Sequence, residues 1–233
     1  FLSYFLQTLY GMADLFIIGQ FDSVSGTTAV SIGSQVMHMI TVMIVGIAMG
    51  TTVMIGKSVG AKLKKETSKI IGNTITLFLG ISIVLTCILL FFVNPIVDIM
   101  STPTQAVAGT RAYLMICFAG IPLITAYNII SSIFRGLGDS KSPMYFVTIA
   151  CVANIVLDYL LIGGLHMGAA GAALGTTLAQ TLSVIVSLAV IIRKQTGITL
   201  KKQDFKPQAE KMEEILKIGI PVALQDGFIQ IAF

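Results

Sequence analysis

Long stretches of this chain contain no charged side chain, and this feature constrains the fold more than any other. A stretch of roughly 20 apolar residues is long enough to cross a bilayer as a helix. Only 11% of the 233 residues are charged, whereas a soluble domain carries about a quarter. Because backbone groups in a bilayer find no water, they must bond to one another within helices. The chain is therefore predicted to be all-α, a polytopic bundle of membrane helices.

Seven apolar stretches divide the chain, and the first and last of them reach its two ends. We therefore expect six helices that make up one lobe plus the start of a seventh, in a fragment truncated at both ends. Pro122 lies inside the fourth stretch and predicts a kink there. The predicted spans are 1–19, 30–56, 70–93, 112–134, 143–162, 168–192 and 215–233.

The most polar segment of the chain, residues 193–214, separates the sixth span from the seventh. It is too short for a domain and is predicted to be a solvated linker between two membrane bundles. The predicted domains are accordingly an N-terminal lobe at 1–192, a cytoplasmic inter-lobe linker at 193–214, and the start of the seventh helix, in a C-terminal lobe, at 215–233.

The distribution of positive charge predicts how the spans are oriented. Of the 15 Lys and Arg residues, all except Arg111 fall on one side of the alternating topology. Because loops rich in Lys and Arg stay inside the cell, segments 57–69, 135–142 and 193–214 are predicted to be cytoplasmic. This orientation accounts for the net charge of +4 without a nucleic-acid partner. We expect a multi-pass protein of the plasma membrane, with the lipid bilayer as its surroundings.

A few polar residues lie inside the predicted spans, where a carboxylate costs about 2.5–3.5 kcal/mol on insertion scales. Asp14 interrupts the first span, and Asp158 interrupts the fifth. Asn154 lies four residues before Asp158, so the two share one helix face. Such residues usually face a bundle interior or a water-filled cavity and belong to an ion or proton pathway.

Counting residues places these groups at one depth. Asp14 and Asp158 each lie five residues before the outer end of their spans, which is about 7.5 Å of helix. Thr176 lies at a similar depth in the sixth span, and Tyr10 lies one turn below Asp14. Two acids, an amide and a hydroxyl predict an oxygen-lined site for a proton or for a hard cation such as Na⁺. The alternative, that each acid merely bonds to a neighbouring helix, stays open.

Other motifs do not support an enzyme. Residues 136–139 match the Gly-x-Gly-Asp pattern of intramembrane aspartyl proteases, but Asp139 lies between Arg135 and Lys141 at the edge of a span. His38 is the only histidine within a predicted span, so no nucleophile–base or metal constellation is present in the sequence. We expect neither an enzymatic activity nor a cofactor.

Several segments, distributed over the whole chain, resemble one known family. They are LYGMADLFIIGQF, FRGLGDSKSPM, NIVLD followed by GAAGAALGTTLAQ, and KIGIPVALQ. In this order they resemble the MATE (multidrug and toxic compound extrusion) family, and within it the DinF-like branch. The resemblance implies twelve spans in two lobes, with this chain supplying the N-terminal half of a monomer. It also implies export of organic cations or drugs in exchange for H⁺ or Na⁺.

The resemblance further implies which residues form the site. The family's coupling site carries over to Asp14, Asn154, Asp158 and Thr176, which are also the expected ligands if the ion is Na⁺. The expected supporting or substrate-cavity residues are Tyr10, Gln7, Asn128 and Tyr113. One departure concerns the seventh span, where some branches carry a glutamate and this chain has Ile229, with Asp226 nearby but offset.

A second function in the same superfamily is a lipid-linked oligosaccharide flippase or polysaccharide exporter. Such a protein is expected to line its cavity with Arg or Lys, which bind pyrophosphate. In this chain Arg111 and Arg135 lie at the ends of spans, and no Lys or Arg lies well inside one. The sequence therefore favours a cationic cargo.

The predicted orientation can be tested by labelling single cysteines in a cysteine-free background. A Lys64→Cys variant should react with a membrane-impermeant thiol reagent only after the cytoplasmic face is exposed, because Lys64 lies in a predicted cytoplasmic loop. Labelling of this position from outside intact cells would contradict the assignment.

Overall fold

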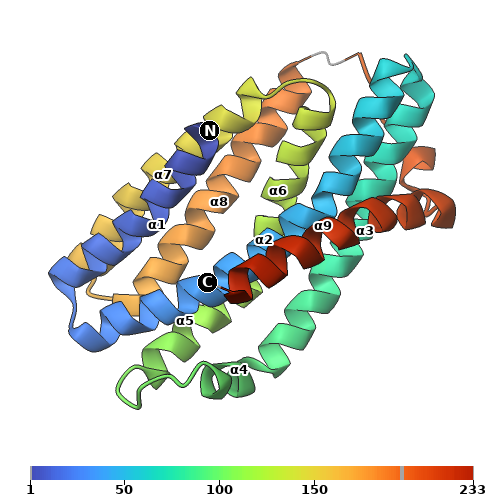
Figure 1. Ribbon diagram of the computed structural model, residues 1–233. Coiled ribbons are helices and arrows are strands. Elements are labelled where there is room, and N and C mark those ends of the chain that lie inside the picture. Colours follow the sequence, from blue (N-terminus) through green and yellow to red (C-terminus); the bar gives the residue numbers. More distant parts are fainter. Residues whose placement is uncertain (1, 195–196, 233) are drawn as a thin grey trace. The chain divides into compact units, whose positions relative to one another are not determined.

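The computed structural model describes residues 2–194 and 197–232, and every regular element in them is a helix (Figure 1). The elements are α1 (Leu2–Phe21), α2 (Val24–Gly60), α3 (Lys64–Phe91), α4 (Val93–Ile99), α5 (Val107–Ala119), α6 (Ile121–Gly136), α7 (Lys141–Asp158), a π-helix (Tyr159–Gly164), α8 (Gly168–Arg193), a 3₁₀-helix (Lys202–Phe205) and α9 (Ala209–Ala232). The prediction of an all-α fold is confirmed.

Within the described residues, five helical segments are long and apolar enough to cross a membrane: α2, α3, α7 with its π-helix, α8 and α9. The pair α5 and α6 makes a sixth if it is counted as one span, and it is bent by 52° at the break. α1, which carries Gln7 and Asp14, has 20 residues but is not among them. The observed helices correspond in order to the seven predicted spans.

The bend between α5 and α6 lies at Gly120, two residues before Pro122. Proline has no backbone N–H to donate to the preceding turn, so it favours a kink or a break in a helix. A Cβ at Gly120 would lie 2.7 Å from Thr177 Cγ2 on α8, so glycine permits this close approach. The kink predicted from Pro122 is confirmed.

Some boundaries differ from those predicted. α2 begins at Val24, six residues before the predicted span, and the Ser23 hydroxyl accepts from the Gly26 N–H at 3.5 Å as an N-terminal cap. α9 begins at Ala209, within the predicted linker. The short helix α4 was not predicted. Polar residues lie at these helix ends, so the apolar stretches used for the prediction do not include them.

The chain forms two compact units, and long helices continue from one to the other. The first comprises Phe1–His38, Val84–Ile124 and Met144–Ser183, and the second comprises Met39–Ile83, Thr125–Pro143 and Val184–Phe233. In the first unit α1 contacts the π-helix, where the Phe21 and Tyr159 rings meet edge to face at 6.0 Å. There the Ser183 hydroxyl of α8 also donates to the Phe146 carbonyl of α7 at 2.9 Å.

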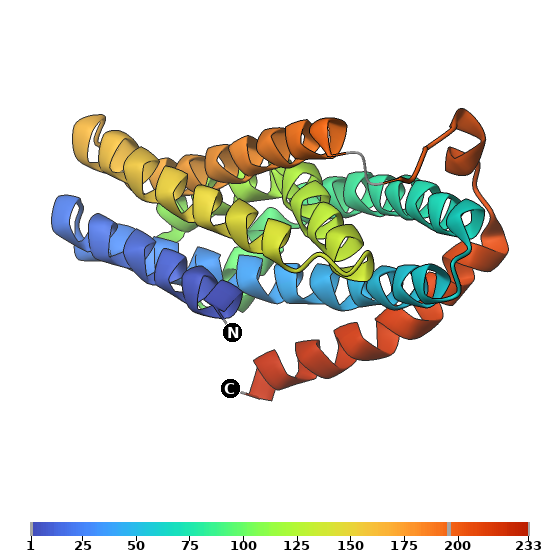
Figure 2. The same ribbon diagram turned by 90° about the horizontal axis from the view of Figure 1, so that it is seen from above.

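In the second unit α9 packs against the second half of α2 (Figures 1 and 2). A Cβ at Gly50 would clash with the Ile215 carbonyl, and a Cβ at Gly219 would clash with Ile47. Glycine at positions 50 and 219 therefore permits this close helix packing. The buried apolar core of this unit consists of Ala48, Met54, Ile55, Ile70, Ile71, Phe78, Ile129, Ile133 and Ile215.

The turn between α6 and α7 is held by Asp139. Its carboxylate accepts from the Lys141 and Ser142 backbone N–H groups at 3.1 and 3.0 Å and from the Lys194 ammonium at 2.7 Å. The hydrogen bond from Lys194 holds the pKa of the Asp139 carboxyl well below its usual range. The stabilisation is therefore complete above the unfolded-state pKa of about 3.9 and decreases as the pH falls below it. Asp139 therefore caps the start of α7. This agrees with the interpretation from sequence that Asp139 does not belong to a protease site.

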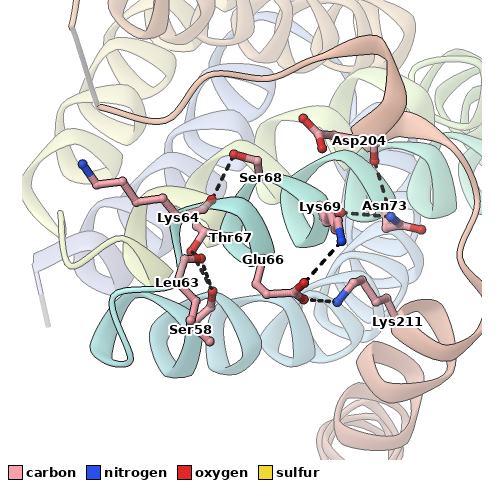
Figure 3. A network of polar contacts seen from close by, with 10 residues as sticks. All are labelled: Ser58, Leu63, Lys64, Glu66, Thr67, Ser68, Lys69, Asn73, Asp204 and Lys211. Carbon is pink, nitrogen blue, oxygen red and sulfur yellow. Dashed lines mark hydrogen bonds and ion pairs between the residues drawn. The ribbon is translucent and has the colours of Figure 1, made fainter.

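The segment that leads into α9 is bound to α3 by polar contacts (Figure 3). The Asn73 side chain is fully buried, and its carbonyl accepts from the Gln208 N–H at 2.7 Å while its amide donates to the Asp204 carbonyl at 3.4 Å. The Thr76 hydroxyl donates to the Phe205 carbonyl at 2.9 Å. A further contact is the ion pair of Glu66 with Lys211 on α9.

This attachment predicts the effect of Asn73→Ala. The variant leaves two backbone groups of the connecting segment without partners, which costs about 1–3 kcal/mol each if they stay buried. We expect lower thermal stability and faster tryptic cleavage at Lys201 and Lys202, both of which are exposed. The matched control is Asn94→Ala, at an exposed asparagine on α4. Equal cleavage rates in the two variants would contradict the proposed attachment.

Candidate functional site

Three helices of the first unit contribute the residues predicted for the site. Asp14 lies in the second half of α1, Asn154 and Asp158 lie one turn apart at the end of α7, and Thr176 lies in the first half of α8. Their exposed fractions are 4%, 0%, 0% and 8%, so all four are buried.

The structure brings these four side chains together. The Thr176 hydroxyl donates to one Asp14 carboxylate oxygen at 3.3 Å. The Asp14 carboxylate also interacts with Asp158 and Asn154, although only the contact with Thr176 has hydrogen-bond geometry. The depth that the sequence predicts for the two acids and the threonine is therefore consistent with their positions, while their function stays a prediction.

A glycine on α8 makes room for one of the acids. A Cβ at Gly175 would clash with an Asp158 carboxylate oxygen, so any other residue would displace this group. Asp158 is also the last residue of α7 before the chain continues as a π-helix. Short π-helical segments are rare and occur frequently at functional sites.

Most of the polar atoms of this group lack a hydrogen-bond partner. Within residues 2–194 and 197–232, no partner is found for the second Asp14 oxygen, for either Asp158 oxygen, or for the amide oxygen and nitrogen of Asn154. Buried polar atoms are normally satisfied, and an unpaired buried charge is costly. A proton or a cation would satisfy the carboxylates, and oxygen atoms are the ligands that hard cations prefer.

The supporting residues fall in different places. Tyr10 interacts with Asp14, Thr176 and Gln180, and it extends the group along α1 and α8. Tyr113 on α5 is buried, contacts Cys117 and interacts with Asp14.

The other residues expected near the site are not members of this cluster. Gln7 is exposed on α1, and Asn128 is buried on α6 in the second unit. Asp226 and Ile229 lie on α9, which also belongs to the second unit; Asp226 is partly buried and Ile229 is exposed.

Sequence reasoning missed three neighbours of the site. Gln180 follows Thr176 by four residues and Cys117 follows Tyr113 by four, so helical spacing could have identified both. The third neighbour is Gly175. Its contact with Asp158 joins α7 to α8, and no pattern within α8 alone could indicate it.

Comparison with known proteins identifies the family. Residues 1–160 match the MatE family. Over 221 residues the chain is 30% identical to the "Probable multidrug resistance protein YpnP" of Bacillus subtilis (strain 168), which covers 94% of this chain and 49% of that protein.

Solved structures give the same result. The chain is similar to the outward-facing conformation of a multidrug resistance MATE family transporter of the MOP superfamily, with a TM-score of 0.91, 26% identity, and coverage of 99% of this chain and 51% of that one. It is also similar to the inward-facing conformation of such a transporter, with a TM-score of 0.89, 27% identity, and coverage of 97% and 51%.

The chain spans about half the length of the curated relatives and solved structures that it matches. Their fold confirms the predicted polytopic helical bundle, and their names confirm a multi-pass membrane protein. With the family matched over residues 1–160 of 233, the chain belongs to the MatE family, whose members are transporters and not enzymes.

Proposed function

We propose that the full-length protein is a secondary active antiporter that exports organic cations or drugs in exchange for H⁺ or Na⁺. The observation that carries this proposal is the Asp14–Asp158 pair, two buried carboxylates with unsatisfied oxygens inside a membrane bundle. Ionisable residues in such positions typically mark ion or proton pathways. Relatives named multidrug resistance and multidrug export proteins support a small-molecule cargo.

The chemistry of the pair supports exchange. Two ionised carboxylates attract a cationic drug, and each proton or Na⁺ that is taken up cancels one negative charge and weakens that attraction. The linkage is reciprocal, so bound drug must weaken ion binding by the same factor. Both ions fit the site, because two adjacent carboxylates can share one proton and because Na⁺ accepts carboxylate, amide and hydroxyl oxygens as ligands.

Gly11 offers a point at which α1 can respond to the ion. Glycine lowers helix stability by about 1 kcal/mol relative to alanine. A Cβ at Gly11 would meet nothing within 4 Å among the described residues, so close packing does not require glycine in this conformation. A weak point in the helix, three residues before Asp14, therefore suits a local bend that follows the charge of the site.

The alternative function is a lipid-linked oligosaccharide flippase or polysaccharide exporter. A cavity for pyrophosphate needs positive side chains, whereas the charged groups in the described cluster are acids. Arg111 is exposed on α5, and Arg135 is exposed in the last turn of α6. The acidic character of the buried site supports a cationic cargo.

Replacing either acid by its amide tests the coupling site. In the full-length protein, Asp14→Asn and Asp158→Asn should each abolish ion-coupled efflux while the protein stays folded, because the change removes a buried charge and keeps the shape. The control is Asp98→Asn, at an exposed acid on α4. Normal export of cations by either site variant, measured in proteoliposomes, would show that the pair does not couple transport.

Competition between the ion and the drug tests the mechanism itself. Drug affinity should fall by about 5–150-fold, the usual range of coupling between sites, when the competing ion is saturating. Titration calorimetry at several pH values without Na⁺, and at several Na⁺ concentrations at fixed pH, separates the two ions. Affinity that responds to neither would rule out antiport at this site and leave the fold unaffected.

A further inference from the structure

The second unit contains a cavity of about 550 Å³, away from the site described above. The turn between α2 and α3, the end of α6 with the turn that follows it, and Lys194, Gly197 and Ile198 after α8 line it. Its size falls within the range of about 300–1,000 Å³ that is typical of small-molecule sites. All three lining segments belong to the predicted cytoplasmic side.

The first of these turns is held rigidly. Lys62 has a left-handed backbone with φ 58° and ends α2 through its N–H bond to the Val59 carbonyl at 2.9 Å. The Leu63 N–H donates to the Ser58 carbonyl at 3.0 Å, and the Ser58 and Thr67 hydroxyls lie 2.7 Å apart. Figure 3 shows the Lys64 side chain extending away from this network. Lys62 and Lys64 are thereby fixed at the rim of the cavity.

Positively charged residues outnumber negatively charged ones around the cavity. Four charged residues line it: Lys62, Lys64, Lys194 and Asp139. Asp139 is bonded to Lys194 and to the start of α7. Within the part of the chain that the structure describes, no ion pair is found for Lys62 or Lys64. Two ammonium groups therefore border a cavity whose acid already has partners, and the missing partner is an anion.

Apart from Thr67 and Gly197, the uncharged lining residues are apolar, and they indicate the kind of anion. Leu63, Phe134 and Leu137 contribute to the wall, and Leu63 is 53% exposed. The cavity thus combines cations with apolar surface at the predicted cytoplasmic boundary of the membrane. Basic pockets in this position bind the headgroups of anionic lipids, whose acyl chains contact neighbouring apolar side chains. A free inorganic anion would make no use of the apolar wall.

We propose that this cavity binds the phosphate headgroup of an anionic phospholipid from the cytoplasmic leaflet, between Lys62 and Lys64. The lipid would bridge the α2–α3 and α6–α7 turns and hold them at the membrane surface. This proposal does not depend on the coupling site, because it involves Lys62 and Lys64 and is tested by lipid binding instead of ion-coupled transport.

The test compares lipid binding to the purified full-length protein by native mass spectrometry, with phosphatidylglycerol and phosphatidylcholine as probes. Lys62→Gln/Lys64→Gln should bind phosphatidylglycerol about 25-fold more weakly than the wild type, or about fivefold for each lysine. The matched control is Lys57→Gln/Lys65→Gln, which removes two exposed lysines from the same helix ends but outside the cavity. The control should bind as the wild type does. Because Lys62 has a positive φ, Lys62→Gly/Lys64→Gln serves as a second variant without backbone strain.

Three outcomes would overturn the proposal. If the control variant lost as much affinity for phosphatidylglycerol as the cavity variant, the lipid would be attracted by the basic surface in general and not by the cavity. Equal binding of phosphatidylcholine would mean that the headgroup charge is not recognised. Displacement of the lipid by inorganic phosphate at millimolar concentration would mean a site for a soluble anion. Unaltered lipid binding in Asp14→Asn would separate this site from ion coupling whatever the outcome for transport.

Discussion

The burial of Asp14 and Asp158 between α1, α7 and α8 is the constraint on which the rest of the first unit depends. Only one of their four carboxylate oxygens has a hydrogen-bond donor within residues 2–194 and 197–232, the Thr176 hydroxyl. Such an arrangement is unfavourable by itself, so the surrounding helix packing must hold it in place. Gly175 lets α8 approach Asp158, and the bond from Ser183 to the Phe146 carbonyl fixes α8 to α7 farther along.

The similarity to transporters in opposite states bears on how such a site works. The chain matches an outward-facing structure with a TM-score of 0.91 and an inward-facing one with 0.89. Because the two scores are nearly equal, the fold of this half resembles both conformations to a similar degree. Under the proposed antiport, this similarity favours a mechanism in which the two carboxylates stay together while access to them alternates.

The fold was largely predictable from sequence because apolar stretches, charge asymmetry and Pro122 all act locally. The match in depth of Asp14, Asp158 and Thr176 was predictable for a similar reason: residue number along a helix converts directly into distance. What the sequence could not predict are contacts that arise only when helices pack. Gly175 against Asp158 and Asn73 against the connecting segment belong to this class. The sequence prediction placed the starts of α2 and α9 too late because polar residues occupy the first turns of both helices.

The contacts of α9 bear on the predicted division between a first lobe and the start of a second at residue 215. In the second unit the first half of α9 lies so close to α2 that neither Gly50 nor Gly219 has room for a Cβ. The Glu66–Lys211 ion pair holds the first turn of α9 against α3, and the Asn73 bonds hold the segment before α9 there. In this conformation residues 202–219 are therefore bound to α2 and α3 and do not form a free linker. The close packing continues past Pro221, because a Cβ at Gly46 on α2 would clash with the backbone of Ala223. Although Pro221 leaves one backbone carbonyl of α9 without its helical partner, a bend at this position would therefore also break packing against α2.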